Sequence, residues 1–338
     1  MILFSISVAY IPIFFYVTFV WWLDRYDREP ISLVLTAFIW GAVGSITLSI
    51  IFEVILGLPL TSFPELIQVT STSVFIAPFV EEVAKALLLF LLFFYYKFDN
   101  LTDGIVYGAI VGFGFAASEN LLYFVRTYFD AGLGVWIVSV IFRITFSSVA
   151  HGIFTSVTGA GLGIAKSTNK AGLRLTLPVI SLAVAIALHS LFNLGIVLAQ
   201  LSSLVFIFLS FSLVPLGVIL ALILVSFALR NESACIKRQL LDEVEGGFIT
   251  RGEYDIVPNY LMRKKAGRMV FGKYDSRSSK LLGRLFHLET RLAFEKDRLI
   301  LSGGWDEVIK RRIKEIREEI AKIQSSLGSV VDDLQELT

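Results

Sequence analysis

Two adjacent carboxylates lie in the middle of an apolar stretch, in the sequence Glu81-Glu82-Val83-Ala84-Lys85. Charged groups in such surroundings are costly unless they are paired or face a cavity, so they are the first candidates for function. Lys85 follows Glu81 by four residues and Glu82 by three, so either carboxylate could pair with it on one helix face. The simplest interpretation is an ion pair that fixes the rotation of a helix. It leaves one carboxylate over, which could act as the general base that activates water.

Three further apolar stretches each carry polar groups. One has Glu119 next to Asn120, the next has His151, and the last has His189 and Asn193, which lie four residues apart and therefore share a helix face. A lone buried histidine is more often structural than catalytic. Because two of the chain's three histidines lie in apolar stretches, together with several carboxylates, we interpret these residues as one site.

Two other ionisable groups lie in apolar stretches. Arg143 precedes His151 by two helical turns, and Glu53 lies close to the end of its own stretch. We interpret Glu53 as a group at the membrane surface and assign it no function.

The composition indicates which elements position these groups. The 338 residues are 55% hydrophobic and 17% charged, with a mean hydropathy of +0.74, which excludes an ordinary soluble protein. Seven stretches are long and apolar enough to span a bilayer. We therefore expect an all-α polytopic bundle of about seven transmembrane helices. The predicted spans are 2–22, 31–58, 73–96, 104–128, 134–165, 172–199 and 202–229.

Charge divides the chain into two regions. Residues 1–229 carry 20 charged side chains and residues 230–338 carry 39, so we expect a transmembrane domain followed by a cytoplasmic helical domain. The net charge of +1 gives no indication of nucleic-acid binding. The single cysteine, Cys235, excludes an intrachain disulfide or a cysteine metal cluster.

Basic residues in the short loops set the expected orientation, because they accumulate on the cytoplasmic side. One set of loops holds Arg126 as its only basic residue, whereas the opposite set holds Arg25, Arg28, Lys97, Lys166, Lys170 and Arg174. We therefore expect the N-terminus outside and the C-terminal region in the cytoplasm. In this topology Glu81, Glu119 and His189 lie at a similar depth, roughly 12 to 15 Å from the outer boundary, as expected for one water-accessible site.

The region after residue 230 has the pattern of soluble helices. Thr250 and Glu253 have the spacing of a capping box, which marks a helix start. Leucines at 281, 285, 288 and 292, and apolar residues from Ile309 to Leu327, repeat as heptads. Ser302-Gly303-Gly304 separates the two runs, so an antiparallel hairpin is expected. Self-association through the heptads is the alternative.

Four motifs in this order resemble the PrsW family of intramembrane endopeptidases, distant relatives of the CAAX prenyl endopeptidases. They are Glu81-Glu82-Val83-Ala84-Lys85, Gly114-Phe115-Ala116-Ala117-Ser118-Glu119-Asn120, His151-Gly152 and His189-Ser190-Leu191-Phe192-Asn193. The CAAX enzymes usually have Arg in place of Lys85 and His in place of Glu119, so the resemblance favours PrsW. It covers about residues 75–200.

The resemblance implies hydrolysis of a peptide bond in a membrane-anchored protein, such as an anti-sigma factor, in a signalling process at the cell membrane. We expect Glu81 or Glu82 to be the general base, with Lys85 holding the other carboxylate ionised. His189 and Asn193 would donate to the developing oxyanion. His151, Glu119 and Asn120 complete the predicted site.

Three alternatives are compatible with these residues. No cofactor is expected, but Zn²⁺ bound by Glu119, His151 and His189 would give three protein ligands and an open position. HExxH is absent, so these ligands would come from three separate spans. The protein could also be a non-enzymatic proton or ion transporter, because polar chains in membrane helices can carry ions. A non-catalytic scaffold is the remaining interpretation.

Overall fold

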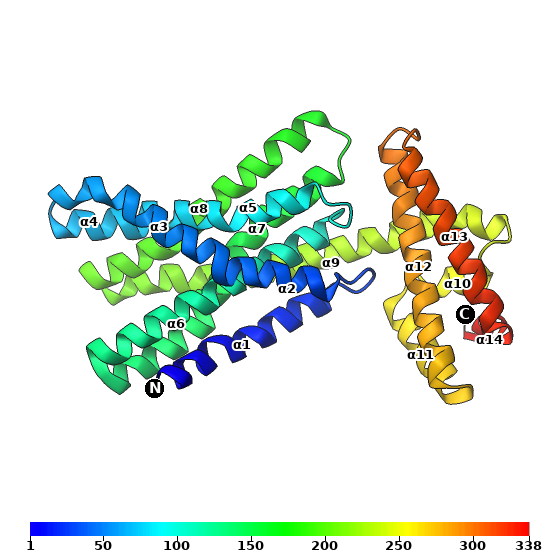
Figure 1. Cartoon of the computed structure of the whole chain (residues 1–338), viewed down its shortest axis with the longest axis horizontal. Coiled ribbons are helices and arrows are strands. Elements are labelled where there is room, and N and C mark those ends of the chain that lie inside the picture. The colour runs from blue at the N-terminus through cyan, green and yellow to red at the C-terminus, as the bar shows by residue number, and fades with distance from the viewer. Residues whose placement is uncertain (338) are drawn as a thin grey trace. The chain divides into compact units, whose positions relative to one another are not determined.

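A computed structural model describes residues 1–337, and its regular secondary structure there is entirely helical (Figure 1). The all-α class predicted from the sequence is confirmed. Contacts divide the chain into two compact units. The first comprises Met1–Asp24 and Glu29–Val225, and the second comprises Arg25–Arg28 and the chain from Ser226 onward. The assignment of residues 1–229 and 230–338 to different functions stays a prediction.

The first unit is a bundle built from long helices and short irregular helical segments. Its elements are α1 (Ile2–Leu23), α2 (Ile31–Ile39), η1 (Trp40–Ser45), α3 (Ile46–Gly57), η2 (Leu58–Ser62), α4 (Glu65–Ser71), η3 (Thr72–Ile76), α5 (Ala77–Phe93), α6 (Leu101–Phe142), η4 (Arg143–Ser147), α7 (Ser148–Lys166), α8 (Ala171–Leu201), η5 (Leu204–Phe206) and the first part of α9 (Ile207–Glu245). Of these, η1, η3 and η4 are π-helical turns, a conformation that is frequent at functional sites.

Five stretches of the described chain are long and apolar enough to cross a membrane. They are Ile2–Leu23, Ile31–Ser62, Leu101–Lys166, Ala171–Leu201 and Leu204–Glu245. Six of the seven predicted spans correspond to these five, because Leu101–Lys166 contains two of them. The seventh, 73–96, corresponds to η3 and α5. Length and composition alone do not select it, since α5 has 17 residues and three charged side chains.

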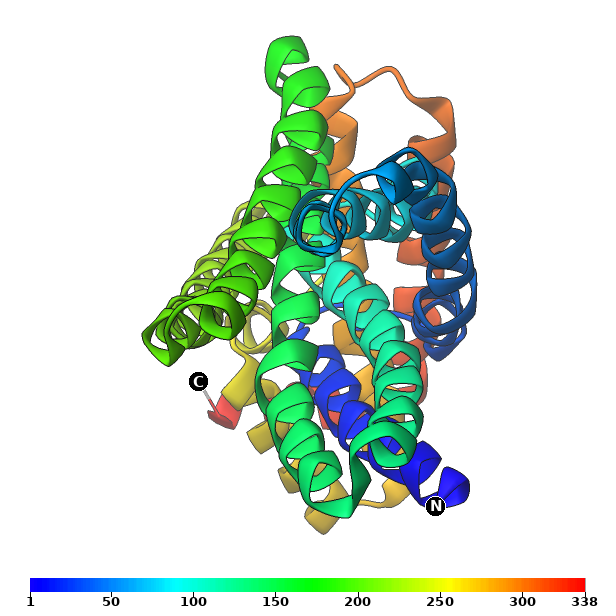
Figure 2. The same ribbon diagram turned by 90° about the vertical axis from the view of Figure 1, so that its left-hand side faces the viewer.

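The long stretch from α6 to α7 reverses direction at Gly132. This residue has φ 78° and ψ −177°, a conformation that glycine adopts easily and other residues rarely do. The rings of Phe124 and Trp136 consequently lie 6.2 Å apart, although they would be about 18 Å apart along a straight helix. Figure 2 shows the resulting hairpin beside α1.

Small residues let α6 and α7 approach closely. A Cβ atom added to Gly104 would collide with the backbone carbonyl of Gly159, and one added to Gly112 would collide with that of His151. Gly108, between them, meets the backbone of α7 in the same way. The three glycines have the small-xxx-small spacing that permits close helix packing, and this packing places His151 directly against α6.

The second unit has its own apolar core. Its elements after the end of α9 are α10 (Arg251–Ile256), α11 (Tyr260–Lys273), α12 (Ser276–Leu301), α13 (Glu307–Leu327), α14 (Ser329–Asp333) and η6 (Leu334–Leu337). The predicted capping box is present, because Thr250 and Glu253 bond to each other's backbone N–H. The heptad residues Leu285, Leu292 and Ile320 are fully buried as α12 and α13 pack together, as expected for the hairpin.

Candidate active site

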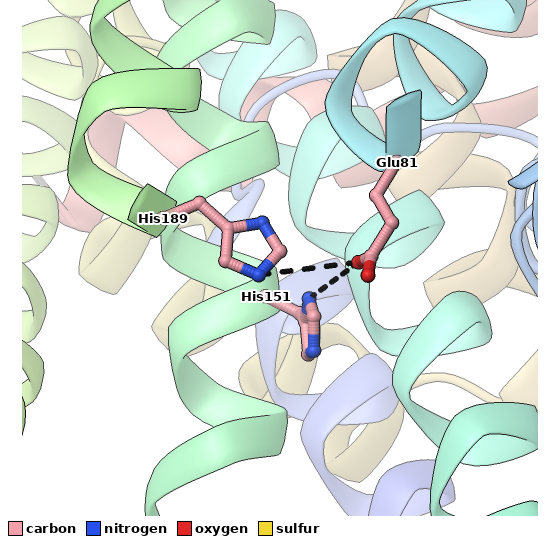
Figure 3. A group of neighbouring side chains, drawn as sticks. All are labelled: Glu81, His151 and His189. Atoms are coloured by element: carbon pink, nitrogen blue, oxygen red, sulfur yellow. Dashed lines mark ion pairs between the residues drawn. The ribbon is translucent and has the colours of Figure 1, made fainter. Parts of the chain in front are cut away.

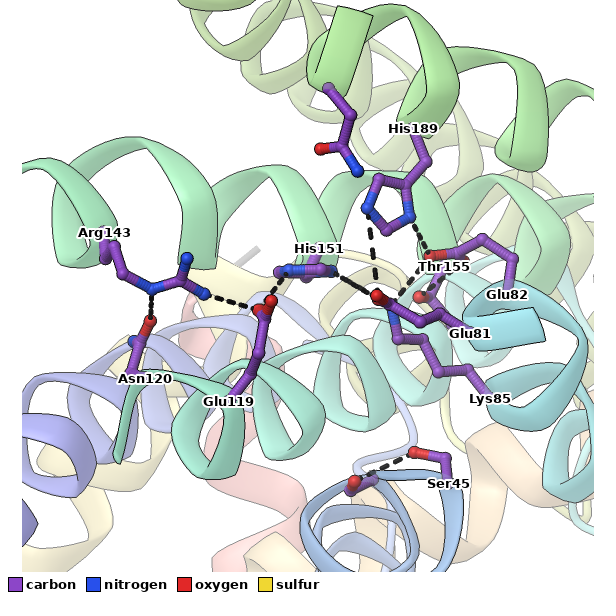
Figure 4. Close-up of polar contacts among 12 residues, drawn as sticks. Ser45, Glu81, Glu82, Lys85, Glu119, Asn120, Arg143, His151, Thr155 and His189 are labelled. Atoms are coloured by element: carbon purple, nitrogen blue, oxygen red, sulfur yellow. Dashed lines mark hydrogen bonds and ion pairs between the residues drawn. The ribbon is translucent and has the colours of Figure 1, made fainter. Parts of the chain in front are cut away.

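Polar side chains from five helical elements meet inside the first unit (Figure 4). They are Glu81, Glu82 and Lys85 from α5, Glu119 and Asn120 from α6, Arg143, His151 and Thr155 from η4 and α7, and His189 from α8. Nearly all of them are buried. The structure therefore brings the residues singled out on separate predicted spans into one connected network, within a bundle whose other interior side chains are mostly apolar.

Lys85 lies at the centre of this network and is fully buried. Its Nζ is 2.8 Å from Oε1 of Glu82, 3.2 Å from Oε2 of Glu81 and 3.0 Å from Nδ1 of His151. The ring of Phe115 covers the same ammonium, at 3.9 Å from the ring centre. The expected pairing of Lys85 is therefore present with both carboxylates. A buried charge needs such partners to offset the loss of its hydration.

Glu82 has partners for both of its oxygens. Oε1 accepts from Lys85 and lies 3.1 Å from Nδ1 of His189, while Oε2 accepts from the hydroxyl of Thr155 at 3.0 Å. Its side chain is 0% exposed. A carboxylate with these partners and no access to water is suited to hold His189 in place.

A second branch of the network leads from His151 to Arg143. Nε2 of His151 lies 2.8 Å from Oε2 of Glu119, and the same oxygen is 2.6 Å from the guanidinium of Arg143. Arg143 also donates from Nε to Asn120, at 2.9 Å, and stacks over the ring of Tyr123. Glu119 is thus held from two sides and in turn orients His151.

Glu81 faces both histidines (Figure 3). Its Oε2 is 3.9 Å from Nδ1 of His151 and 4.0 Å from Nε2 of His189. One ligand atom from each residue lies within 4.8 Å of the other two. The two imidazole rings are perpendicular, with their centres 5.0 Å apart.

These three donors fit a divalent metal ion. One carboxylate and two imidazoles, with an open fourth position, are the ligands of many catalytic zinc sites. The ring nitrogen of each histidine that faces away from Glu81 bonds to another carboxylate, Glu82 or Glu119, as in sites where such bonds orient metal-bound imidazoles. The charges also fit, because Glu81, Glu82 and Glu119 outnumber the cations of Lys85 and Arg143 by one. The ligand set considered from the sequence contained Glu119, which lies behind the ring of His151 in this structure.

A cavity of about 540 Å³ adjoins the site. Glu81, Glu119, Arg143, His151 and His189 line it, whereas Glu82, Lys85 and Asn120 do not. Its remaining wall is formed mainly by apolar side chains of α3, α5, α6 and α8, such as Ile46, Ala77, Leu122 and Ile196. Through this cavity, water and an extended peptide segment could reach the five ionisable side chains from Glu81 to His189 that line it.

The structure adds detail that the sequence did not provide. Asn193 lines the cavity and donates to the backbone carbonyl of Ser73 in η3 at 2.9 Å, so part of its donor capacity holds the chain that leads into α5. Arg143 and Thr155 belong to the network although neither was proposed as a site residue. Thr155 lies four residues after His151 and therefore shares its helix face, which is the sequence pattern that could have indicated Thr155 as a site residue. Glu53, interpreted as a surface group, lines the cavity.

Comparisons with known proteins point to one family. A family model described as "PrsW family intramembrane metalloprotease" matches residues 29–226. The chain is 32% identical over 194 residues to Protease PrsW of Bacillus subtilis, covering 56% of this chain and 79% of that protein. For the protein of the same name from Halalkalibacterium halodurans, the identity is 28% over 212 residues, which is 62% of this chain and 90% of the relative.

The chain spans a smaller part of a third relative, Protease PrsW of Geobacillus kaustophilus. The two are 29% identical over 146 residues, which is 42% of this chain and 58% of the relative. No solved structure matches the chain.

Buried carboxylates and histidines beside a cavity in a bundle of membrane-spanning helices, together with these matches, define an intramembrane protease. The chain belongs to the PrsW family. The matched range contains all four motifs on which the resemblance was based, so that interpretation is confirmed. The family assignment favours the protease over the transporter and scaffold alternatives, and it makes the chain a multi-pass membrane protein.

Proposed function

We propose that the protein hydrolyses peptide bonds of membrane-anchored proteins at a divalent metal site, with Glu81, His151 and His189 as the ligands. One observation carries this proposal. Both histidines turn one ring nitrogen toward Glu81 while a separate carboxylate engages the other nitrogen. A structural ion pair would not require this arrangement at two histidines from different helices.

The protein's own groups have distinct tasks in this proposal. A bound ion such as Zn²⁺ supplies Lewis acidity toward the peptide carbonyl and the attacking water. Glu82 and Glu119 orient His189 and His151 and keep one tautomer of each ring. Arg143, beside Glu119 at the cavity wall, offers its remaining donors to the substrate carbonyl.

A metal-independent mechanism is the second candidate, and the position of Lys85 favours it. Its ammonium lies 3.2 Å from Oε2 of Glu81 and 3.0 Å from Nδ1 of His151. The protein's own cation therefore already lies beside both of these groups. Glu81 would then be the general base, since it lines the cavity and Glu82 does not. His189 and Asn193 would donate to the oxyanion, as the sequence suggested.

The expected setting of the reaction follows from the chain's loop charges and its family. We propose that the N-terminus lies outside, the second unit lies in the cytoplasm, and the site opens toward the outer half of the bilayer. Substrates would be single-span proteins of the anti-sigma-factor kind, cut in or beside the membrane as part of signalling.

The full-length protein purified in detergent distinguishes the two mechanisms. Metal content would be measured by mass spectrometry, and cleavage would be measured on a reporter with one membrane span, before and after chelation and zinc addition. The metal mechanism predicts about one ion per chain, lost together with activity in His151→Ala, His189→Ala and Glu81→Gln. The metal-independent mechanism predicts activity that resists chelation yet disappears in Glu81→Gln.

Asp130→Asn is the matched control for these variants. Asp130 is an exposed carboxylate paired with Arg126, outside the cavity, so its replacement should leave metal content and cleavage unchanged. Substrates would be identified by comparing new protein N-termini in membranes containing the wild type or Glu81→Gln/Glu82→Gln. Full cleavage by Glu81→Gln would contradict both mechanisms.

A further inference from the structure

The outward face of α11 in the second unit combines positive charge with exposed apolar side chains. Lys264, Lys265 and Arg268 are exposed on this face, and they lie between Leu261, which is 73% exposed, and Phe271, which is 61% exposed. The spacing of these five residues, at 3, 4, 7 and 10 positions after Leu261, places them on one stripe of the helix. We call this stripe the α11 face.

The packing of α11 fixes the direction of this face. Ala266 and Val270 are fully buried in the core of the second unit, and Met262 and Met269 pack against the same core. These four residues form the opposite stripe of the helix. The α11 face is therefore presented to the surroundings by a folded helix, and it cannot turn inward without disrupting the core.

The cations of the α11 face lack acidic partners. Within the described chain, Lys264, Lys265 and Arg268 form no ion pair, although Lys264 lies 4.9 Å from the ring centre of Tyr260. The surrounding segment, residues 260–291, contains nine basic and two acidic residues. Neither acidic residue offsets the charge of this face, because Glu289 is buried and Asp275 caps the start of α12.

We propose that the α11 face binds the anionic surface of a lipid bilayer. Lysine and arginine are attracted to anionic headgroups, and exposed leucine and phenylalanine bury their side chains at the boundary of the acyl chains. The second unit is covalently joined to membrane-spanning helices, and such a connection raises the effective concentration of lipid around it. A nucleic acid would satisfy the charges, but it offers no apolar layer for Leu261.

This attachment is independent of the peptidase mechanism. It uses residues of the second unit, none of which lines the cavity of the active site. A failure of the lipid experiment below therefore leaves the proposed hydrolysis unaffected, and loss of proteolysis in an active-site variant leaves the lipid attachment unaffected.

The full-length protein in lipid nanodiscs provides the test, because both faces of the bilayer are then accessible. A spin label would be attached at Gly272→Cys in a Cys235→Ser background, since Cys235 is the only cysteine. Gly272 continues the α11 face, and a Cβ there meets no atom within 4 Å. Collisions with oxygen and with a water-soluble nickel chelate report whether the label lies at the lipid or in water. Nanodiscs of phosphatidylcholine would be compared with nanodiscs in which about a third of the lipid is phosphatidylglycerol.

We expect the label to become shielded from the nickel chelate in the anionic nanodiscs, and to return to water at high salt because the charges are then screened. Each basic residue near an anionic leaflet strengthens binding roughly fivefold, so Lys264→Gln/Lys265→Gln/Arg268→Gln should weaken attachment on the order of 100-fold. Leu261→Ser/Phe271→Ser should weaken it without changing the response to salt.

Two variants are matched controls on other surfaces of the unit. Lys310→Gln/Arg311→Gln/Lys314→Gln removes the same charge from α13, where acidic residues are interspersed, and Trp305→Ala removes a more exposed apolar side chain. Both should leave the label shielded. A label that stays accessible to nickel in anionic nanodiscs, or equal loss of shielding in the α13 control, would overturn the proposal. Shielding by added DNA but not by anionic lipid would assign the face to nucleic acid and overturn it as well.

Discussion

Glu82 lies directly behind His189, with Oε1 of the carboxylate 3.1 Å from Nδ1 of the imidazole. Since Glu82 also accepts from Lys85, it is an acceptor toward the ring, and Nδ1 therefore carries the proton. In the neutral ring the other nitrogen, Nε2, has a lone pair, and this nitrogen faces Glu81. The two adjacent glutamates thus have different positions: Glu81 borders the cavity, and Glu82 holds His189, a proposed ligand, from behind.

Glu82→Gln should therefore weaken the site without removing a proposed ligand. The neutral amide holds His189 less firmly, and loss of such a supporting carboxylate typically costs 10- to 100-fold in metal affinity. Zinc titration of the purified variant, with cleavage measured in parallel, checks this. Thr155→Val, which removes one hydrogen bond to Glu82, should give a smaller effect in the same direction. Unchanged affinity in Glu82→Gln would show that His189 needs no support from this residue.

Lys85→Met should strongly destabilise the first unit. The substitution keeps the length of the side chain but leaves Glu81 and Glu82 without their buried cation, and removal of one partner from a buried ion pair typically costs about 3–5 kcal/mol. Thermal unfolding of the protein in detergent would measure the loss. Lys170→Met is the control, since Lys170 is exposed at the start of α8. A variant as stable as this control would mean that the two carboxylates find other partners.

Much of this arrangement was predictable from local patterns. Uninterrupted apolar stretches indicated the helices, since the backbone must satisfy its own hydrogen bonds in lipid. Small-xxx-small spacing, as at Gly104, Gly108 and Gly112, is typical of a close helix contact, and charged residues inside spans indicated the site. Both signals depend on residues close together in sequence, which is why they could be recognised.

Other features depend on contacts that no local pattern encodes. Pairing of Arg143 with Glu119 joins residues that lie on opposite sides of the Gly132 turn, so their spacing in sequence gave no signal. Glu53 lies near the end of its predicted span, and only the packing of α3 places it at the cavity. Which of Glu81 and Glu82 borders the cavity depends on the rotation of α5, and that rotation is set by neighbouring helices.

Gly112→Ala should reduce cleavage by displacing His151. The new methyl group would collide with the backbone carbonyl of His151, and overpacking of this kind typically costs about 1–3 kcal/mol. Activity and unfolding temperature would be measured together, and we expect both to fall. Gly134→Ala is the matched control in the same helix, because its Cβ meets no atom within 4 Å. If the two variants behave alike, the close approach of α6 to α7 is not what positions His151.

The second unit should become more stable as the pH falls, because of Glu289. Burial and the neighbouring Glu253 raise the pKa of the Glu289 carboxyl well above its usual value of 4.5, although Arg263 acts in the opposite direction. The carboxyl also finds no hydrogen-bond donor within the described residues. Between pH 4.5 and the raised pKa, the folded unit holds a proton that the unfolded chain releases. Its stability is therefore greatest at the low end of this interval and falls as the pH rises, by up to about 1.4 kcal/mol per pH unit.

Hydrogen exchange of the full-length protein measures this effect in peptides from α12 and α13. Protection, corrected for the intrinsic pH dependence of exchange, should be higher at pH 5 than at pH 8 in the wild type, and it should fall with at most the slope given above. Glu289→Gln should remove this trend and increase protection at pH 8, since the amide carries no charge to bury. Glu315→Gln, at an exposed position on α13, should retain the wild-type trend. If Glu289→Gln still showed that trend, another group would have to be its source.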